Sequence, residues 1–315
     1  MTPTIDFSAL KQLQLWLNLS EDEQDAVVKN LEQWLGGEYV HQYTLSYSDN
    51  PSLRVPTFRN LPTGLEFNLI IGGQFNMGLS VQEEEVFLGL IEEDEEVKLW
   101  FDRKFIDSMR PVHTVLVRPF LMSRFPILNY LAREHLGLNL DDFISEYEVD
   151  PDDEQKLLPA SLNREQINVI IKKIRFDLPS EAQWEYAYRG GTSTLFYWGD
   201  DFLRFKDEYM LCEFSDREKC KEAANPFGLV GLCVGEWCKN SYCPDYSNAS
   251  ENDLPLVAET RNYVMRGGAA YVWPWQNCGE WISCVSAMRY AAECDEFAAG
   301  RLVKVLDLND ELADK

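Results

Sequence analysis

The side chains best suited to chemistry in this sequence are eight cysteines, all in its last third. They lie at positions 212, 220, 233, 238, 243, 278, 284 and 294. Cys233, Cys238 and Cys243 repeat at a spacing that could hold a metal cluster. No histidine is near them, however, and the spacing matches no established zinc pattern. We therefore interpret the cysteines mainly as reduced thiols that pack in the interior.

Other constellations that carry chemistry are missing from the sequence. The three histidines, His41, His113 and His135, are too scattered to form a histidine-rich metal site. We find no Ser–His–acid arrangement, no phosphate-binding loop and no glycine-rich dinucleotide fingerprint. The sequence therefore indicates none of these familiar reaction types.

Aromatic side chains are concentrated over residues 271–281, as Tyr271, Trp273, Trp275 and Trp281. Exposed aromatic residues at this density are typical anchors for a protein partner. We expect at least two of the three tryptophans to be partly exposed on an ordered loop. The alternative is that all of them pack in the core.

The charge balance restricts the choice of partners. Of the 315 residues, 45% are hydrophobic, which is enough for a core, and the formal net charge is −24. Such a charge repels phosphate backbones and anionic lipids, so we expect neither nucleic acid nor a membrane surface as the main partner. A partner protein with a basic surface is compatible with it.

The start of the sequence, residues 1–6, has neither the basic residues nor the apolar run of a signal peptide. We also find no stretch of about 18 apolar residues that could span a bilayer. From these features we expect a cytoplasmic protein.

The secondary-structure elements that must position these residues are short helices and short strands. Ser20 and Glu23 form a capping box for the second of two helices within 5–36, and Ser180 caps a helix over 180–189. Residues 66–78 predict two strands around a Gly-Gly turn. Further strands are expected near 113–120, 262–266 and 301–306, and further helices near 127–135 and 161–174. This mixture indicates an α+β fold rather than a doubly wound sheet.

These elements suggest a division of the chain. We expect a helical N-terminal extension over 1–62, a main domain over 63–306 and an acidic tail over 307–315. Residues 82–108 form an acidic insertion, with apolar residues interleaved among the acidic ones. The insertion is either a solvated helical segment with one docked face or a docking site for a basic partner.

Several ordered motifs resemble the formylglycine-generating-enzyme (sulfatase-modifying-factor) family. The most specific is Leu-Pro-Ser-Glu-Ala-Gln-Trp-Glu-Tyr-Ala at 178–187. Before it come the glycine-rich segment 71–78, similar to the family's opening hairpin, and a strand motif at 110–115. After it come 225–229, 235–238, 264–268 and 286–289, in the family's order. The resemblance implies a C-type-lectin-like fold, with the helix at 180–189 packed on a twisted, mostly antiparallel sheet.

We predict a structural role for most of the motif residues. Trp184 is a large apolar wedge on the core face of its helix. Glu185 and Arg266 are candidates for a buried ion pair, because such charges are rarely left unpaired inside a protein. Gly267 and Gly268 allow a backbone to pass close to a neighbour. We assign Glu236, Trp237 and Arg289 to the same structural group.

The family resemblance implies a copper-dependent oxidase that uses O2 to convert a substrate cysteine into formylglycine. It would require two thiolates spaced C-x4-C after the Arg-Gly-Gly motif, because Cu(I) prefers sulfur ligands. Counted forward from Arg266, these positions are Val272 and Asn277; counted back from Arg289, they are Gln276 and Trp281. The alternative is a displaced copper pair at Cys278 and Cys284.

The resemblance also implies a calcium loop, which usually reads Gly-Asn-Val-Trp-Glu-Trp and gives oxygen ligands to the ion. In this sequence the loop over 231–237 is two residues shorter and lacks the Gly-Asn, although Glu236 and Trp237 remain. We therefore do not expect a complete calcium cage.

Two functions follow from these observations. The first is a non-catalytic module that binds a protein or another ligand, as related domains do in the variable proteins of diversity-generating retroelements. The second is a copper-dependent oxidase that generates formylglycine or a related cysteine oxidation product. We favour the binding module, without a cofactor, over the enzyme.

Overall fold

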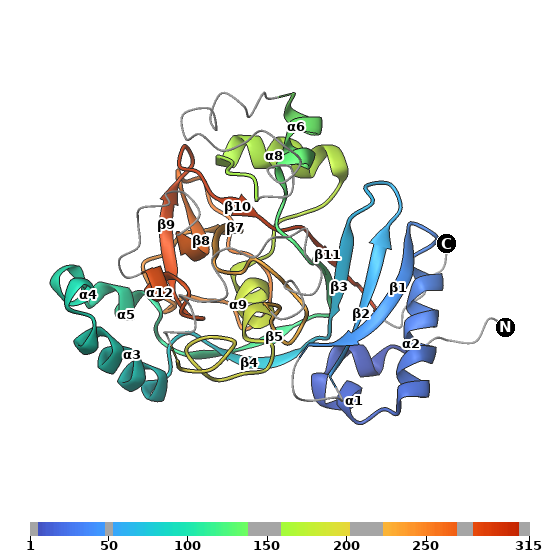
Figure 1. The fold of residues 1–315 in the computed structure, drawn as a ribbon, viewed down its shortest axis with the longest axis horizontal. Coiled ribbons are helices and arrows are strands. Elements are labelled where there is room, and N and C mark those ends of the chain that lie inside the picture. The colour runs from blue at the N-terminus through green and yellow to red at the C-terminus, as the bar shows by residue number, and fades with distance from the viewer. Residues whose placement is uncertain (1–5, 48–52, 138–158, 202–222, 270–279, 309–315) are drawn as a thin grey trace.

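Two mostly antiparallel sheets meet around one central helix in the computed structural model, which describes residues 6–47, 53–137, 159–201, 223–269 and 280–308 (Figure 1). The larger sheet has the strand order β1-β2-β3-β6-β11. Its strands are β1 (Tyr39–Ser46), β2 (Arg54–Asn60), β3 (Glu66–Ile70), β6 (Phe120–Ser123) and β11 (Val303–Val305).

The second sheet has the order β10-β7-β8-β9, in which only β10 and β7 run parallel. Its strands are β7 (Val234–Ser241), β8 (Asn262–Ala269), β9 (Arg289–Glu293) and β10 (Ala299–Gly300). A separate two-stranded antiparallel sheet joins β4 (Gly73–Met77) to β5 (His113–Val117).

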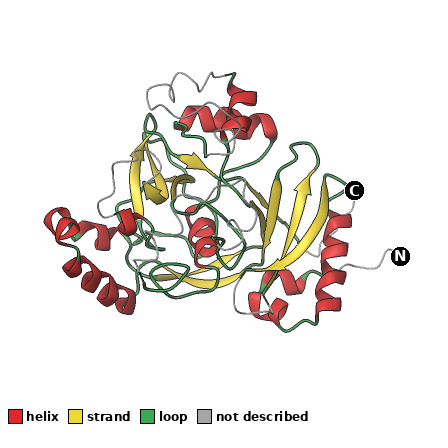
Figure 2. Ribbon diagram, viewed as in Figure 1, coloured by secondary structure: helices red, strands yellow, loops and turns green. Residues whose placement is uncertain are grey.

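Helix α9 (Glu181–Arg189) lies at the centre of the molecule, in contact with β4, β5, β7 and β8 (Figure 2). Ser180 caps it in a capping box with Gln183, and Gly190 ends it in the left-handed conformation. Every residue of α9 is buried. The prediction of a capped helix packed on a mostly antiparallel sheet is confirmed.

The other helices surround these sheets. At the N-terminal end lie η1 (Ser8–Lys11), α1 (Leu13–Leu17) and α2 (Glu21–Trp34), and α2 begins with the predicted Ser20–Glu23 capping box. The acidic insertion forms α3 (Val81–Glu93), α4 (Glu95–Trp100) and α5 (Lys104–Ser108). The rest are α6 (Asn129–Leu136), α8 (Arg164–Ile174) and α12 (Glu280–Ser283). No helix among the described ranges is long and apolar enough to cross a bilayer.

Two expectations from the sequence are wrong. Residues 1–62 are not a purely helical extension, because β1 and β2 lie within them and continue the main sheet through β3. Residues 66–78 are not a hairpin either: β3 pairs with β2 and β6, while β4 pairs with β5. The chain passes from the larger sheet to the two-stranded sheet between β3 and β4. At this point the Gly72 amide donates to the Leu10 carbonyl, at 2.8 Å.

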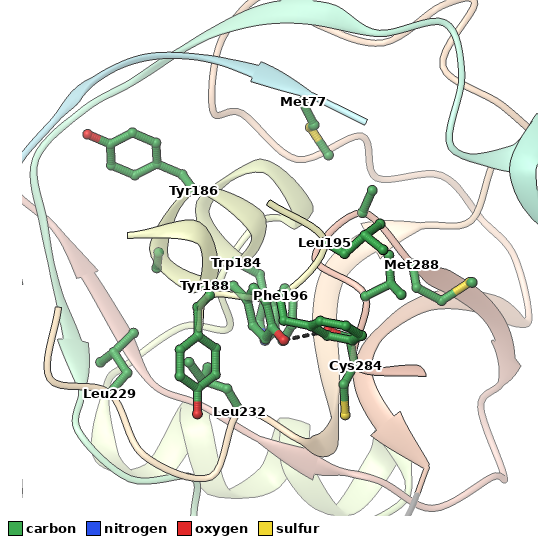
Figure 3. Packing of buried hydrophobic residues seen from close by; sticks show 14 of the residues in the cluster. Met77, Trp184, Tyr186, Tyr188, Leu195, Phe196, Leu229, Leu232, Cys284 and Met288 are labelled. Atoms are coloured by element: carbon green, nitrogen blue, oxygen red, sulfur yellow. Dashed lines mark hydrogen bonds between the residues drawn. The ribbon is translucent and has the colours of Figure 1, made fainter. Parts of the chain in front are cut away.

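The core is rich in aromatic residues. Around α9, the rings of Trp184 and Tyr188 stack with centroids 4.9 Å apart, and Figure 3 shows their buried neighbours, Cys284 and Met288 included. Trp237 belongs to a second buried cluster, where its indole donates to the Leu162 carbonyl at 2.8 Å.

Several tyrosines are buried, and we therefore expect their phenols to ionise only at high pH. Burial, partly opposed by the nearby Arg124 charge, raises the pKa of Tyr43 from 10.0 to about 12. Burial also raises the pKa of Tyr186 and Tyr246. Because these folded-state pKa values are raised, the stability that the neutral phenols contribute is fully present below pH 10.0 and is lost as the pH rises toward 12.

We therefore expect a spectrophotometric titration of the phenols to show a late, cooperative ionisation step that coincides with loss of near-UV circular dichroism. Titration of all the tyrosines near their ordinary pKa, with the fold intact, would contradict the burial described here.

Candidate functional site

A ladder of alternating charges runs through the buried centre of the domain. Arg189 donates to Glu83 at 2.6 Å and to Glu185 at 2.9 Å. Glu185 in turn pairs with Arg266, and neither side chain has any exposed surface. The predicted Glu185–Arg266 ion pair is therefore present, and it ties α9 to β8.

The ladder continues toward the second sheet. Two nitrogens of the Arg289 guanidinium donate to the two carboxylate oxygens of Glu181, at 2.7 and 3.1 Å. Arg266 lies 3.9 Å from the same carboxylate. Arg289 also donates to the carbonyls of Ser108 and Cys243. Three acidic and three basic side chains thus neutralise one another and link α9 with α3, β8, β9 and the end of α5.

The electrostatics of the ladder favour a structural role. Burial alone would raise the pKa of Glu185, but the Arg266 and Arg189 charges more than offset burial, and the pKa lies below its ordinary value. Glu185 also accepts from the Gly78 amide at 3.0 Å. A carboxylate held ionised and fully bonded is unsuited to general acid–base catalysis at neutral pH.

Glu236 tests whether the calcium loop can hold its ion. Its oxygens accept from Arg301 at 2.7 and 3.2 Å and from the Trp184 indole at 2.8 Å. Neither Glu236 nor Arg301 has exposed surface. A guanidinium thus holds the carboxylate that the family motif would give to calcium, and Glu236 does not fit as a calcium ligand.

Gly267 and Gly268 make the close approach that the sequence predicts. Gly267 has a φ of +77°, a backbone conformation that residues other than glycine rarely adopt. A Cβ atom on Gly268 would lie only 1.8 Å from the Cys233 carbonyl oxygen and 3.3 Å from the Cys284 sulfur. The end of β8 therefore runs directly against the segment that leads into β7.

Cys284 is the described member of the alternative copper pair. Its side chain is completely buried, and its carbonyl accepts a hydrogen bond from Tyr188. A thiolate there would place negative charge among apolar core residues, which is costly. The second member, Cys278, lies outside the described residues. In the described part of the chain, no group of three or more His, Cys, Asp or Glu side chains could hold a metal ion.

Trp281 is the described member of the predicted aromatic surface, and it is buried, with 2% of its surface exposed. Its ring packs edge-on against Phe87 of α3 at 5.8 Å, and its indole donates to Asp94 at 3.0 Å. Trp281 is therefore an internal contact between α12 and the insertion, and it is not an exposed anchor. Tyr271, Trp273 and Trp275 lie outside the described residues.

Comparisons with known proteins agree with this geometry. Residues 153–298 match the Sulfatase-modifying factor enzyme 1-like domain family, FGE-sulfatase. The match covers 146 of the 315 residues, a little under half of the chain. Glu181, Glu185, Glu236, Arg266 and Arg289 all lie within the matched residues.

Individual relatives are more distant. Over 121 residues the chain is 31% identical to the serine/threonine-protein kinase Pkn1 of Chlamydia trachomatis, a match that covers 36% of this chain and 18% of that protein. The chain thus matches less than a fifth of that relative's length.

Two solved structures align with most of this chain. Treponema denticola variable protein 1 aligns with a TM-score of 0.52 and 17% identity, over 76% of this chain and 95% of that one. PvdO from Pseudomonas aeruginosa aligns with a TM-score of 0.48 and 15% identity, over 85% and 99%. The first of these shows that the α+β fold is of the FGE-like type.

The structure adds charged residues that sequence reasoning missed in the FGE-sulfatase scaffold: Glu83, Glu181, Arg189 and Arg301. Two of them carry a local signal, since Arg189 stands four residues after Glu185 and Glu83 completes a capping box with Ser80. Glu181 and Arg301 have no such signal, because their partners are 108 and 65 residues away in sequence.

The insertion presents an exposed surface next to α12. Its 27 residues, 82–108, carry ten acidic and three basic side chains, a net charge of −7. Among them Leu99 is 88% exposed and Trp100 46% exposed. In Figure 1, α3, α4 and α5 form a lobe that projects from the sheets. We call the face that carries Leu99, Trp100 and the neighbouring carboxylates the insertion surface.

Proposed function

We propose that this chain is a non-catalytic module that binds another protein, built on an FGE-sulfatase scaffold. The observation that carries the proposal is the insertion surface, where large apolar side chains stand exposed among carboxylates. Leu99 and Trp100 would anchor a partner by burial of apolar area, and the charge of −7 would favour a basic partner surface and speed its association.

The position of Trp281 supports the same proposal. Counted back from Arg289, Trp281 stands where the family's oxidases would carry the second copper thiolate. A buried indole bonded to Asp94 holds the insertion onto the domain at this point. Trp281 therefore helps to hold the segment that carries the insertion surface in place on the domain.

Site-specific photocrosslinking tests the binding proposal. A photoreactive amino acid at Leu99, in the cells that naturally make the protein, is expected to capture one discrete partner. Trp100→Ala should remove that crosslink. A probe at Val169, which is 38% exposed on α8 and remote in sequence from the insertion, is the control and should capture nothing. Equal capture from both positions would contradict a dedicated surface.

The alternative function is the copper-dependent oxidase, with Cys278 and Cys284 as ligands. We expect the purified protein, supplied with Cu(I) and O2, to leave cysteine-containing peptides unchanged when they are analysed by mass spectrometry. Conversion of a peptide thiol to an aldehyde, abolished by Cys278→Ser, would establish the oxidase and overturn the non-catalytic proposal.

A further inference from the structure

A second surface, separate from the insertion surface, surrounds the free edge of β4. A cleft of about 880 Å³ lies along this strand. Its walls come from the start of α1, from the first residues of the insertion and from the loop after α9. The β4 residues Gly73, Gln74, Phe75 and Asn76 line it. In Figure 1, β4 lies at the lower rim of the molecule, with β5 above it.

One edge of this small sheet is covered and the other is open. On the β5 side, the Leu116 amide donates to the Glu251 carbonyl at 2.9 Å, which closes that edge. On the β4 side, no described strand pairs with β4 other than β5. The strand sequence Gly-Gln-Phe-Asn-Met contains neither charge nor proline, the features by which proteins usually protect such an edge.

The hydrogen bonds at the two ends of β4 reveal which main-chain groups face outward. The Gly72 amide bonds the Leu10 carbonyl, and the Gly78 amide and carbonyl bond Glu185 and Arg189. Alternate residues of a strand direct both groups to the same side. The amides and carbonyls of Gln74 and Asn76 therefore also point away from β5, into the cleft, and they have no partner among the described residues.

The cleft has no net charge, although the protein as a whole carries −24. Its lining includes only two charged side chains, Glu83 and Arg189, which pair with each other at 2.6 Å. The remaining polar lining consists of amides and hydroxyls: Gln12, Gln14, Gln74, Asn76, Ser80, Gln82, Thr192 and Ser193, together with the Tyr186 phenol. Phe75, half-buried against Tyr186 at 5.3 Å, adds an apolar contact. This lining suits a neutral ligand that both donates and accepts hydrogen bonds.

We propose that the cleft binds an extended, uncharged segment of a partner polypeptide, which adds to β4 as a third strand. The peptide main chain offers donors and acceptors at the two-residue interval at which Gln74 and Asn76 present theirs. A saccharide would match the side chains but not this interval. Five residues of β4 give an edge about 17 Å long, enough for a peptide of similar length.

The test compares main-chain with side-chain recognition at a single position. Peptides are selected from a phage-displayed library of random linear sequences on the full-length protein, and their affinities are measured by fluorescence anisotropy. Asn76→Pro removes the outward amide but is tolerated on an edge strand, whereas Asn76→Ala keeps the amide. Both variants lose the bond between Asn76 and the Thr114 hydroxyl equally. Thermal denaturation checks that both are folded.

We expect Asn76→Ala to bind a selected peptide with nearly unchanged affinity and Asn76→Pro to bind it about tenfold or more weakly. Amide hydrogen exchange at Gln74 and Asn76 should be fast in the free protein and slow in the complex. Equal weakening by both variants would indicate a side-chain site for another ligand class. Failure to select any peptide, or unchanged exchange at these amides, would overturn the proposal.

Discussion

Arg266→Met is expected to lower the free energy of unfolding by about 3–5 kcal/mol, because it leaves a buried carboxylate without one of its two cationic partners. Arg266 and Glu185 are both fully buried. The substitution would also leave the carbonyls of Ala287 and Met288 without the guanidinium that now donates to both of them. Urea unfolding followed by circular dichroism measures the loss.

Arg261→Met is the matched control for this prediction. The Arg261 side chain is 68% exposed and lies 3.8 Å from Glu293 and 3.5 Å from Asp295. Exposed pairs of this kind contribute about 0–1 kcal/mol, so the control should change stability little. A similar small effect for both variants would mean that the buried ladder does not stabilise the fold.

The pH dependence of stability in acid gives an independent test of the buried charge ladder. The pKa of Glu185 lies below its ordinary value of 4.5 in the folded protein. Its contribution to stability is therefore present above that value and is lost as the pH falls through the folded-state pKa. In the Arg266→Met protein only Arg189 would offset the effect of burial on the Glu185 carboxyl, so its pKa should be higher. The pH midpoint of acid unfolding should therefore move to higher pH.

Gly268→Ala is expected to destabilise the protein by about 3 kcal/mol or to prevent folding, at the upper end of the effects of overpacking. The new methyl group would lie 1.8 Å from the Cys233 carbonyl oxygen and 2.8 Å from its carbon. Both are main-chain atoms, which cannot rotate away as a side chain could. Relief of the clash would require β8 to separate from the segment before β7.

Gly89→Ala provides a control of opposite sign. Gly89 lies inside α3, and a Cβ atom there would meet nothing within 4 Å. Alanine in a helix interior is favoured over glycine by about 0.5–1 kcal/mol, and the variant should therefore be slightly more stable. Denaturant midpoints of the two variants, measured together, decide the question. Equal midpoints would show that the contact at Gly268 can relax without cost.

The sequence alone was sufficient for features that depend on short-range chemistry. The caps at Ser20 and Ser180 are encoded within four residues, and both form as predicted. The order of the motifs predicted the FGE-like α+β fold. The Glu185–Arg266 pair was predictable because buried charges require partners and both residues stand in core-facing motifs.

Only the tertiary structure decided which distant segments meet. Local pattern could not reveal that β1 and β2 join the main sheet or that β3 and β4 separate, because strand pairing depends on long-range register. Trp281 resembled an exposed anchor, yet Phe87 and Asp94, which stand 194 and 187 residues earlier in the sequence, bury it. The open edge of β4 is likewise invisible in sequence, because a strand's neighbours, rather than its residues, determine which of its main-chain groups remain unpaired.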